Sequence, residues 1–147
     1  MLYKAIATVC GIGFLPKGGG TAAAALYCMI WLWWPSKSIS IEIFLTLLVV
    51  TVGIYSASKV EGVWGVDSNR VVVDEFAGMM ISLLFIPMEI RYVVFAFIAF
   101  RFFDIVKPLG IRQLEKLPSG WGVMADDILS GIYAWILLEG CIWFKIF

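Results

Sequence analysis

Long apolar runs separated by short polar segments dominate the chain. Residues 18–36 and 43–58 carry no charge, residues 76–88 and 92–100 are shorter apolar stretches, and residues 128–144 contain a single charge. A membrane-spanning helix needs about 20 apolar residues, and about 17 at the least. The third and fourth stretches reach this length only with flanking charges, or they form a tight re-entrant pair. The pattern therefore predicts five helices, at residues 18–34, 41–57, 71–87, 90–106 and 124–144.

The composition strengthens the membrane interpretation. Of the 147 residues, 62% are hydrophobic, and eleven basic residues balance eleven acidic ones, so the net charge is zero. An average soluble domain is about 45–50% apolar even when Gly is counted. The lack of a basic excess argues against binding to nucleic acid. We expect one domain, residues 1–147, with an all-α fold: a polytopic membrane helical bundle of about four to five helices, some short or re-entrant.

The basic residues are distributed unevenly between the ends of the predicted helices. If the N-terminus lies in the cytoplasm, eight Lys and Arg residues fall on the inner side, and only Lys37, Arg91 and Lys145 fall outside. Positive charge accumulates on the cytoplasmic side of membrane proteins. Most acidic residues fall on the same inner side. The sequence thus predicts a multi-pass membrane protein whose polar site faces the cytoplasm.

The residues that are absent restrict the chemistry. The chain contains no His, which excludes a Ser-His-Asp triad and a His-ligated zinc. Cys10, Cys28 and Cys141 lie far apart in apolar runs, so they form neither a metal-type pair nor a disulfide framework.

Carboxylates cluster on three predicted helices whose relevant ends share one membrane face. Asp74 and Glu75 begin the third helix, Asp104 lies near the end of the fourth, and Asp126 and Asp127 open the fifth. A helix N-terminus favours a carboxylate, so one exposed pair there would be ordinary. Together, however, oxygen ligands without His or paired Cys suit Mg²⁺, or Mn²⁺ as a substitute.

Two basic residues accompany the acidic residue of the fourth helix. Arg101, Asp104 and Lys107 follow each other at intervals of three residues, so they form a stripe along one helical face. Cations beside a carboxylate suit a phosphate group next to a metal ligand. A salt-bridged helix end gives the same pattern.

A glycine-rich stretch precedes the first long apolar helix. Three glycines lie between Lys17 and Thr21. Glycine lets backbone N–H groups turn toward an anion, and a helix N-terminus adds partial positive charge. Thr21 would cap the helix or bind an oxygen. The alternative interpretation is a flexible helix entrance without a ligand.

Four segments carry a resemblance to a known family: GFLPKGGGT, VDSNRVVVDEFAGM, FRFFDIVKPLGIR and GWGVMADDILSGI. From about Gly11 to Ile136 the chain resembles the phosphatidylglycerophosphatase A family, membrane enzymes that remove the terminal phosphate of phosphatidylglycerophosphate. The resemblance implies Mg²⁺-dependent hydrolysis that gives phosphatidylglycerol and inorganic phosphate. The family's acidic positions fall on Asp67, Asp74, Glu75, Asp104, Asp126 and Asp127, and its basic positions on Arg101, Lys107 and Arg112.

These observations give a set of expected roles. The substrate is a phospholipid in the membrane, and either a water molecule or one carboxylate attacks the phosphorus. A small membrane transporter, or a structural membrane protein with buried carboxylates, is the alternative function. The expected catalytic residues are Asp74, Glu75, Asp104, Asp126, Asp127, Arg101 and Lys107; the metal ligands are Asp74, Glu75, Asp104 and Asp127; the substrate-binding residues are Lys17, Gly18, Gly19, Gly20, Thr21, Asp67 and Arg112.

Overall fold

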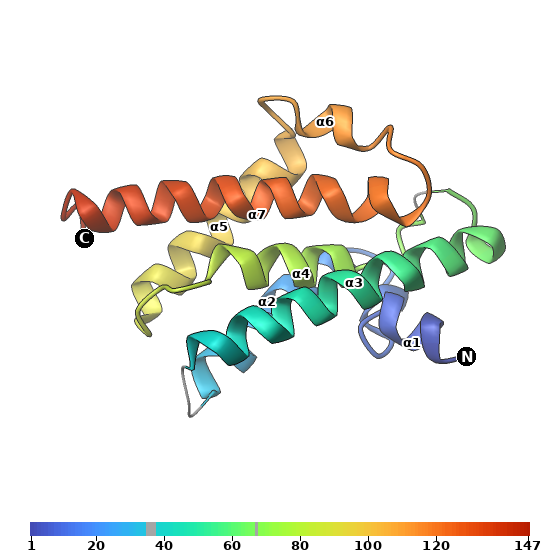
Figure 1. Cartoon of the computed structure of the whole chain (residues 1–147), viewed down its shortest axis with the longest axis horizontal. Helices are drawn as coiled ribbons and strands as arrows, with labels where there is room; N and C mark the ends of the chain where they lie inside the picture. Colours follow the sequence, from blue (N-terminus) through green and yellow to red (C-terminus); the bar gives the residue numbers. More distant parts are fainter. Residues whose placement is uncertain (35–37, 67) are drawn as a thin grey trace.

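The protein is an α-helical bundle in a computed structural model that describes residues 1–34, 38–66 and 68–147 (Figure 1). These residues contain seven α-helices, one 3-10 turn and no strand. The predicted all-α fold is therefore confirmed. The elements are α1 (Leu2–Ala7), the 3-10 turn η1 (Ile12–Phe14), α2 (Gly19–Trp33), α3 (Ile39–Trp64), α4 (Val73–Ser82), α5 (Ile90–Val106), α6 (Ile111–Leu114) and α7 (Gly120–Trp143).

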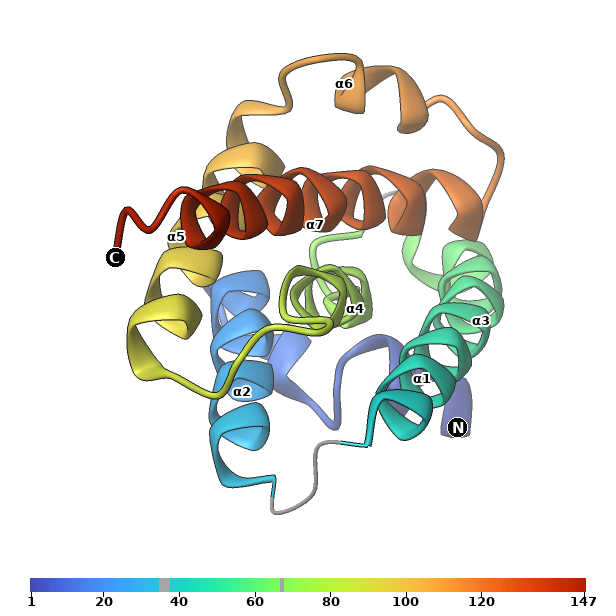
Figure 2. The ribbon, with the colours of Figure 1, turned by 60° about the vertical axis from the view of Figure 1, so that its left-hand side comes forward.

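The short helix α4 lies in the centre of the bundle. It packs against α2, α3, α5 and α7, which surround it in the end-on view of Figure 2. Seven of its ten residues are buried, and its Met79 and Ala77 are fully enclosed. One apolar cluster joins α4 to α2, α5 and α7, and a second joins α4 to α1, α3 and α7. Most side chains on α4 are therefore held in place by packing.

Two helices, α3 and α7, are long and apolar enough to cross a membrane. They contain 26 and 24 residues, which at about 1.5 Å per residue exceeds the roughly 30 Å of a bilayer's hydrocarbon core. Helix α3 exposes large apolar side chains such as Phe44, Leu47 and Leu48. A row of exposed apolar groups on a long helix indicates contact with lipid. Helix α4 has ten residues and is too short to span.

Three predicted helix boundaries are wrong. Helix α3 continues past residue 57 to Trp64, where Gly65 ends it with a positive φ of 87°. Helix α4 is shorter than predicted because the chain leaves helical geometry at Leu83, before Pro87. Helix α7 starts at Gly120, whose N–H donates a hydrogen bond to the Ser58 hydroxyl oxygen of α3 at 3.1 Å. The short helices α1 and α6 were not predicted.

The two ends of the bundle differ in what they carry. Helix α1, the end of α3 and the start of α7 lie at one end, whereas the C-terminus and the α4–α5 connection lie at the other (Figure 1). The first turn of α4, with Asp74 and Glu75, points toward the end that holds α1. The Lys37 position, predicted on the outer side, lies outside the described residues.

Candidate active site

A polar cavity of about 400 Å³ opens between α2, α4, α5 and α7. Its walls combine the first turns of α2 and α4 with the end of α5 and the first part of α7. Residues of the loop before α4 complete its rim. The lining residues are Leu15, Pro16, Lys17, Gly18, Gly19, Gly20, Ser68, Asn69, Val71, Asp74, Glu75, Arg101, Asp104, Lys107, Val123, Asp126 and Asp127.

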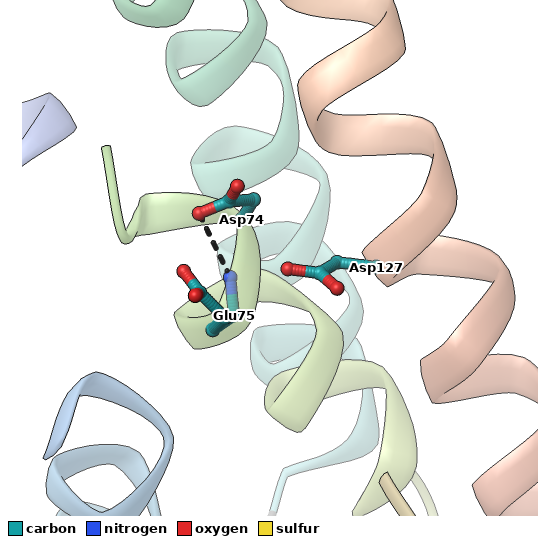
Figure 3. A group of neighbouring side chains, drawn as sticks. All are labelled: Asp74, Glu75 and Asp127. Atoms are coloured by element: carbon teal, nitrogen blue, oxygen red, sulfur yellow. Dashed lines mark hydrogen bonds between the residues drawn. The ribbon is translucent and has the colours of Figure 1, made fainter. Parts of the chain in front are cut away.

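Three carboxylates form the acidic centre of this cavity. Asp74, Glu75 and Asp127 each offer one oxygen, and these oxygens all lie within 4.8 Å of one another. Figure 3 shows Asp127 reaching from α7 toward the first turn of α4. Asp74 and Asp127 are buried, at 8% and 3% exposure, and Glu75 is partly buried. Such a group of oxygens from two helices is a ligand set for a hard divalent cation.

Two glycines allow the helices that carry these carboxylates to approach closely. A methyl group placed on Gly131 of α7 would overlap the carbonyl oxygen of Gly78 on α4. A methyl group placed on Gly78 would lie 2.7 Å from the backbone oxygen of Asp127. Glycine at a helix crossing permits backbone contact that larger residues prevent. The crossing therefore sets Asp127 directly beside Asp74.

Among the described residues, no lysine or arginine forms an ion pair with these three carboxylates. Burial raises the pKa of Asp74 well above its usual value, and the nearby charges of Glu75 and Asp127 raise it further. Burial also raises the pKa of Glu75. Within the described chain, three buried carboxylate oxygens have no hydrogen-bond partner: Glu75 Oε2, Asp126 Oδ1 and Asp127 Oδ1. Buried carboxylate oxygens without partners are costly unless a cation compensates them, so the donor set fits Mg²⁺.

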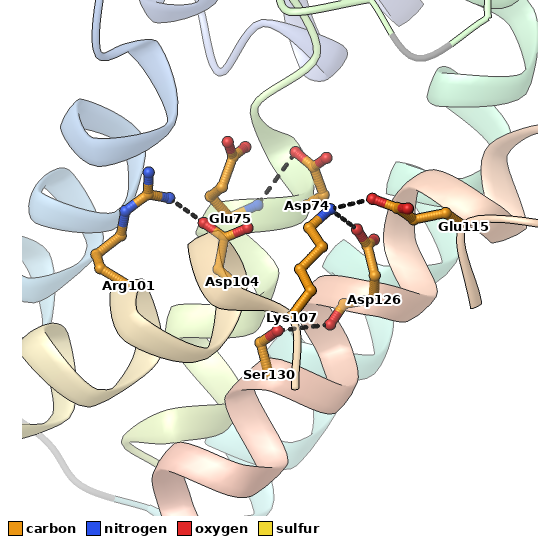
Figure 4. Close-up of polar contacts among 8 residues, drawn as sticks. All are labelled: Asp74, Glu75, Arg101, Asp104, Lys107, Glu115, Asp126 and Ser130. Atoms are coloured by element: carbon orange, nitrogen blue, oxygen red, sulfur yellow. Dashed lines mark hydrogen bonds and ion pairs between the residues drawn. The ribbon is translucent and has the colours of Figure 1, made fainter. Parts of the chain in front are cut away.

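The two predicted cations line the same cavity, but they pair with different carboxylates (Figure 4). Arg101 forms an ion pair with Asp104, one turn further along α5. Lys107 Nζ instead lies 2.6 Å from Asp126 Oδ2 and 2.6 Å from Glu115 Oε1. Burial lowers the pKa of Lys107, but the hydrogen bonds to these two carboxylates outweigh it and raise the pKa overall. These hydrogen bonds thus favour the charged form of Lys107.

The glycine-rich stretch forms the opposite wall. Gly18 is the N-cap of α2 with a positive φ of 77°, so the first N–H groups of α2 begin beside the cavity. A methyl group on Gly20 would fall on the Glu75 carboxylate. Thr21 is exposed inside the first turn, so the prediction that it caps the helix is wrong. The N-cap of α2 is Gly18, three residues before Thr21.

Most of the residues predicted for the site meet in this cavity. Thr21 and Arg112 do not line it, and both are exposed. Asp67 lies outside the described residues. Asp104 lines the cavity and pairs with Arg101, and it lies outside the three-carboxylate group. The residues brought together are Lys17, Gly18, Gly19, Gly20, Asp74, Glu75, Arg101, Asp104, Lys107, Asp126 and Asp127.

Three polar residues of the site were not predicted. Ser68 and Asn69 line the rim, and Glu115 holds Lys107 from the loop after α6. Ser68 and Asn69 could have been predicted from the sequence DSN before the acidic pair, because Ser and Asn favour turns. Glu115 is separated from Lys107 by a turn and a short helix, so no spacing rule connects them.

Buried carboxylates beside an arginine and a lysine, in one polar cavity of an apolar helical bundle, are typical of an enzyme that acts on phosphate esters. A comparison with known families makes this specific. The family model described as phosphatidylglycerophosphatase A matches residues 5–142. The chain therefore belongs to the phosphatidylglycerophosphatase A family, whose members are phosphoric monoester hydrolases.

Three similar proteins cover most of the chain. A protein of Bacteroides thetaiotaomicron, provisionally named a phosphatidylinositol-3-phosphatase, is 43% identical over 94% of this chain and 92% of its own length. The phosphatidylglycerophosphatase A of Haemophilus influenzae is 43% identical over 68% of this chain and 64% of its own length. The phosphatidylglycerophosphatase A of Escherichia coli is 33% identical over 83% of this chain and 73% of its own length. No solved structure matches the chain significantly.

Proposed function

We propose that the protein hydrolyses phosphatidylglycerophosphate to phosphatidylglycerol and inorganic phosphate, with Mg²⁺ as cofactor, at the cytoplasmic face of the inner membrane. The observation that carries this proposal is the meeting of Asp74, Glu75 and Asp127 in one cavity with Arg101 and Lys107. Family membership and the names of two relatives support the substrate. The excess of basic residues at the end with the cavity supports the cytoplasmic orientation.

Asp74, Glu75 and Asp127 are the residues that would hold Mg²⁺. When bound, the ion supplies positive charge that offsets negative charge on the phosphate oxygens. Asp104 was also a predicted ligand, but its ion pair with Arg101 gives it a different role. It fixes the guanidinium group at the wall of the cavity, beside the carboxylates. Arg101 is then a positioned phosphate-binding group.

The phosphate group of the substrate meets donors from three sides of the cavity. Arg101 offers a planar set of N–H donors, which suits two phosphate oxygens at once. Lys107 adds a compact positive charge from the end of α5. The first N–H groups of α2, after Gly18, face the cavity and favour an anion. Together these groups would bind the doubly charged phosphate. The glycerol of the lipid would then lie on the membrane side of the phosphate.

Asp126 is suited to activate the attacking water. Its Oδ2 accepts the hydrogen bond from Lys107, and its buried Oδ1 has no partner among the described groups. The free oxygen accepts a proton from a water molecule as the new phosphorus–oxygen bond forms. The bond between phosphorus and the glycerol oxygen breaks, and that oxygen takes up a proton. The products are a lipid alcohol and inorganic phosphate.

A second candidate substrate is a phosphatidylinositol phosphate. The observation that favours it is the Bacteroides relative, which matches 94% of this chain and carries the name of a phosphatidylinositol-3-phosphatase. The cavity of about 400 Å³ is larger than a phosphate group needs. Ser68 and Asn69 on its rim provide hydroxyl and amide groups that would contact the hydroxyls of either headgroup.

The transporter and structural alternatives are less well supported. Membership of a hydrolase family weighs against both. A transporter also needs its ionisable groups near the middle of the bilayer, whereas Asp74 and Glu75 occupy the first turn of α4, which faces the end of the bundle that holds α1. A structural protein gains nothing from three buried carboxylate oxygens without partners.

A phosphate-release assay on the purified protein tests the proposal. The substrates are phosphatidylglycerophosphate, phosphatidylinositol 3-phosphate, phosphatidic acid and a soluble phosphomonoester, each with Mg²⁺ and with EDTA. We expect phosphatidylglycerophosphate to be hydrolysed fastest, with Mg²⁺ only. Faster hydrolysis of the inositol lipid would establish the second candidate instead. Equal release with EDTA would contradict the metal site.

A further inference from the structure

An apolar groove runs along the outside of the bundle between α2 and α5. It encloses about 270 Å³, and every one of its lining side chains is apolar. Met29 and Ala25 form the α2 wall, and Val94 and Phe97 form much of the α5 wall. Val94 and Met29 are half exposed, at 50% and 56%. The groove is therefore open to the lipid side of the molecule.

The two walls of the groove continue into the polar cavity. On α5, Ile90, Val94, Phe97 and Arg101 are separated by four, three and four residues, so they lie on one helical face. The first three line the groove, and Arg101 lines the cavity. The same face changes from apolar to cationic within one turn.

Helix α2 shows the same transition. Met29, Ala25 and Thr21 follow each other one turn apart, and Gly18 comes three residues before Thr21. Met29 and Ala25 line the groove, and Gly18 lines the cavity. Thr21, exposed and outside the cavity, lies at the level between the two. A hydroxyl at this level suits the ester region of a phospholipid.

The apolar face of α5 extends well beyond the cavity. Eleven residues separate Ile90 from Arg101, which corresponds to about 16 Å along a helix. A lipid whose phosphate lies beside Arg101 would therefore have room for an acyl chain along this face.

We infer that the α2–α5 groove holds one acyl chain of the substrate lipid while its terminal phosphate occupies the polar cavity. The inference rests on the proposed function, because it takes the substrate to be a phospholipid. The acyl chain contributes binding through buried apolar surface, and it fixes the direction from which the headgroup enters. Thr21 lies beside the glycerol backbone.

A second apolar hollow provides a matched control. It encloses about 300 Å³ and is lined by residues that include Leu48 and Val52 of α3 and Val73 of α4. Helix α3 forms a wall of this hollow but contributes no residue to the polar cavity. The α3 wall therefore does not lead a lipid headgroup from this hollow to the carboxylates.

A large side chain placed in the α2–α5 groove or in the control hollow tests which of them holds the acyl chain. Val94→Trp fills the α2–α5 groove, and Leu48→Trp fills the control hollow; the two replaced residues are exposed to similar degrees, 50% and 45%. The substrates are dioleoyl and dibutyryl phosphatidylglycerophosphate. We expect Val94→Trp to raise the KM for the dioleoyl lipid about tenfold, because each methylene of the long acyl chain that is buried contributes about 0.8 kcal/mol. The KM for the dibutyryl lipid should change less than twofold, because its short chains bury few methylenes. Leu48→Trp should change neither. An unchanged dioleoyl KM in Val94→Trp would overturn the inference.

Photolabelling gives a readout that does not depend on turnover. The intact protein is reconstituted in vesicles that contain phosphatidylglycerol with a diazirine on one acyl chain. We expect labelling on Ala25–Leu32 and Ile90–Phe97, and its loss in Val94→Trp but not in Leu48→Trp. Labelling concentrated on α3 would overturn the inference even if the wild type hydrolyses the lipid. Groove labelling in a wild type that releases no phosphate would leave the lipid site standing and reject the proposed function.

Discussion

The carboxylate of Glu75 occupies the space that a side chain on Gly20 would fill. Gly20 belongs to the first turn of α2, and Glu75 belongs to the first turn of α4. The glycine-rich stretch therefore does more than present backbone N–H groups to an anion. It also leaves room for one member of the three-carboxylate group, which links two sequence motifs separated by 55 residues.

Gly20→Ala should reduce activity without much loss of stability. The new methyl group would displace only the end of the Glu75 side chain, which is flexible, so we expect the melting temperature to change by no more than about 2 °C. Because the displaced carboxylate leaves the group formed with Asp74 and Asp127, kcat should fall at least tenfold. Gly140→Ala is the control, because a methyl group there meets no atom within 4 Å. Full activity in Gly20→Ala would remove Glu75 from the metal site.

Asp74→Asn should stabilise the metal-free protein and abolish turnover. The substitution removes one of three mutually repelling buried carboxylates, so the melting temperature in EDTA should rise. In the wild type, Mg²⁺ at about one hundred times its Kd should stabilise the fold by about 2.7 kcal/mol. This Mg²⁺-dependent shift should be lost in Asp74→Asn. Thermal unfolding with and without Mg²⁺ measures both effects, and a retained shift would contradict the assigned ligands.

Lys107→Ala should cost both stability and catalysis. Its partner Asp126 has a side chain only 8% exposed, and leaving a buried carboxylate without its cation costs about 3 kcal/mol. We also expect kcat/KM to fall at least a hundredfold, because Lys107 contacts the phosphate. Glu115→Gln is the comparison: its side chain is 39% exposed, so its ion pair contributes less than about 1 kcal/mol. Equal losses in the two variants would contradict the central role of Lys107.

Gly131→Ala should weaken the crossing of α4 and α7. The methyl group would meet the rigid backbone of Gly78 rather than a side chain that can turn away. Overpacking of this kind costs about 1–3 kcal/mol. Unfolding by denaturant in detergent micelles measures the loss. The control is Gly62→Ala on α3, where a methyl group meets nothing within 4 Å and helix propensity alone should stabilise the protein slightly.

The orientation of the bundle can be measured with single cysteines. Lys116 and Lys145 are both exposed, near opposite ends of α7. In a background without Cys10, Cys28 and Cys141, Lys116→Cys should react with an impermeant thiol reagent only in inside-out vesicles. Lys145→Cys should react only in right-side-out vesicles. The reverse pattern would place the cavity on the outer side of the membrane.

The apolar pattern predicted α2 and α5 well because it is a property of the local sequence. The first and fourth predicted helices, 18–34 and 90–106, nearly coincide with α2 and α5. The pattern failed where distant contacts decide. The start of α7 at Gly120 depends on Ser58, which lies 62 residues away in the chain. As a result Asp126 and Asp127 lie inside a helix, beyond its first turn, rather than at its cap.

The candidate site was predictable in its residue types but not in its pairings. The acidic clusters and the two cations could be read from the sequence, since few polar residues interrupt the apolar runs. Their partners could not, because a stripe at three-residue spacing predicts Lys107 beside Asp104. In the structure Lys107 ends α5 in a left-handed conformation with φ of 50°, and its side chain turns to α7 instead. That change of direction depends on the turn geometry.

The brevity of α4 has a consequence for biogenesis. A ten-residue segment with two carboxylates in its first turn is too short and too polar to partition into lipid by itself. We therefore expect α4 to enter the membrane only together with the helices that pack around it. Helix α7 is the last of these helices to be synthesised. Assembly of the candidate site and completion of the polypeptide would then be a single late event, so a chain truncated before α7 should fail to bury α4.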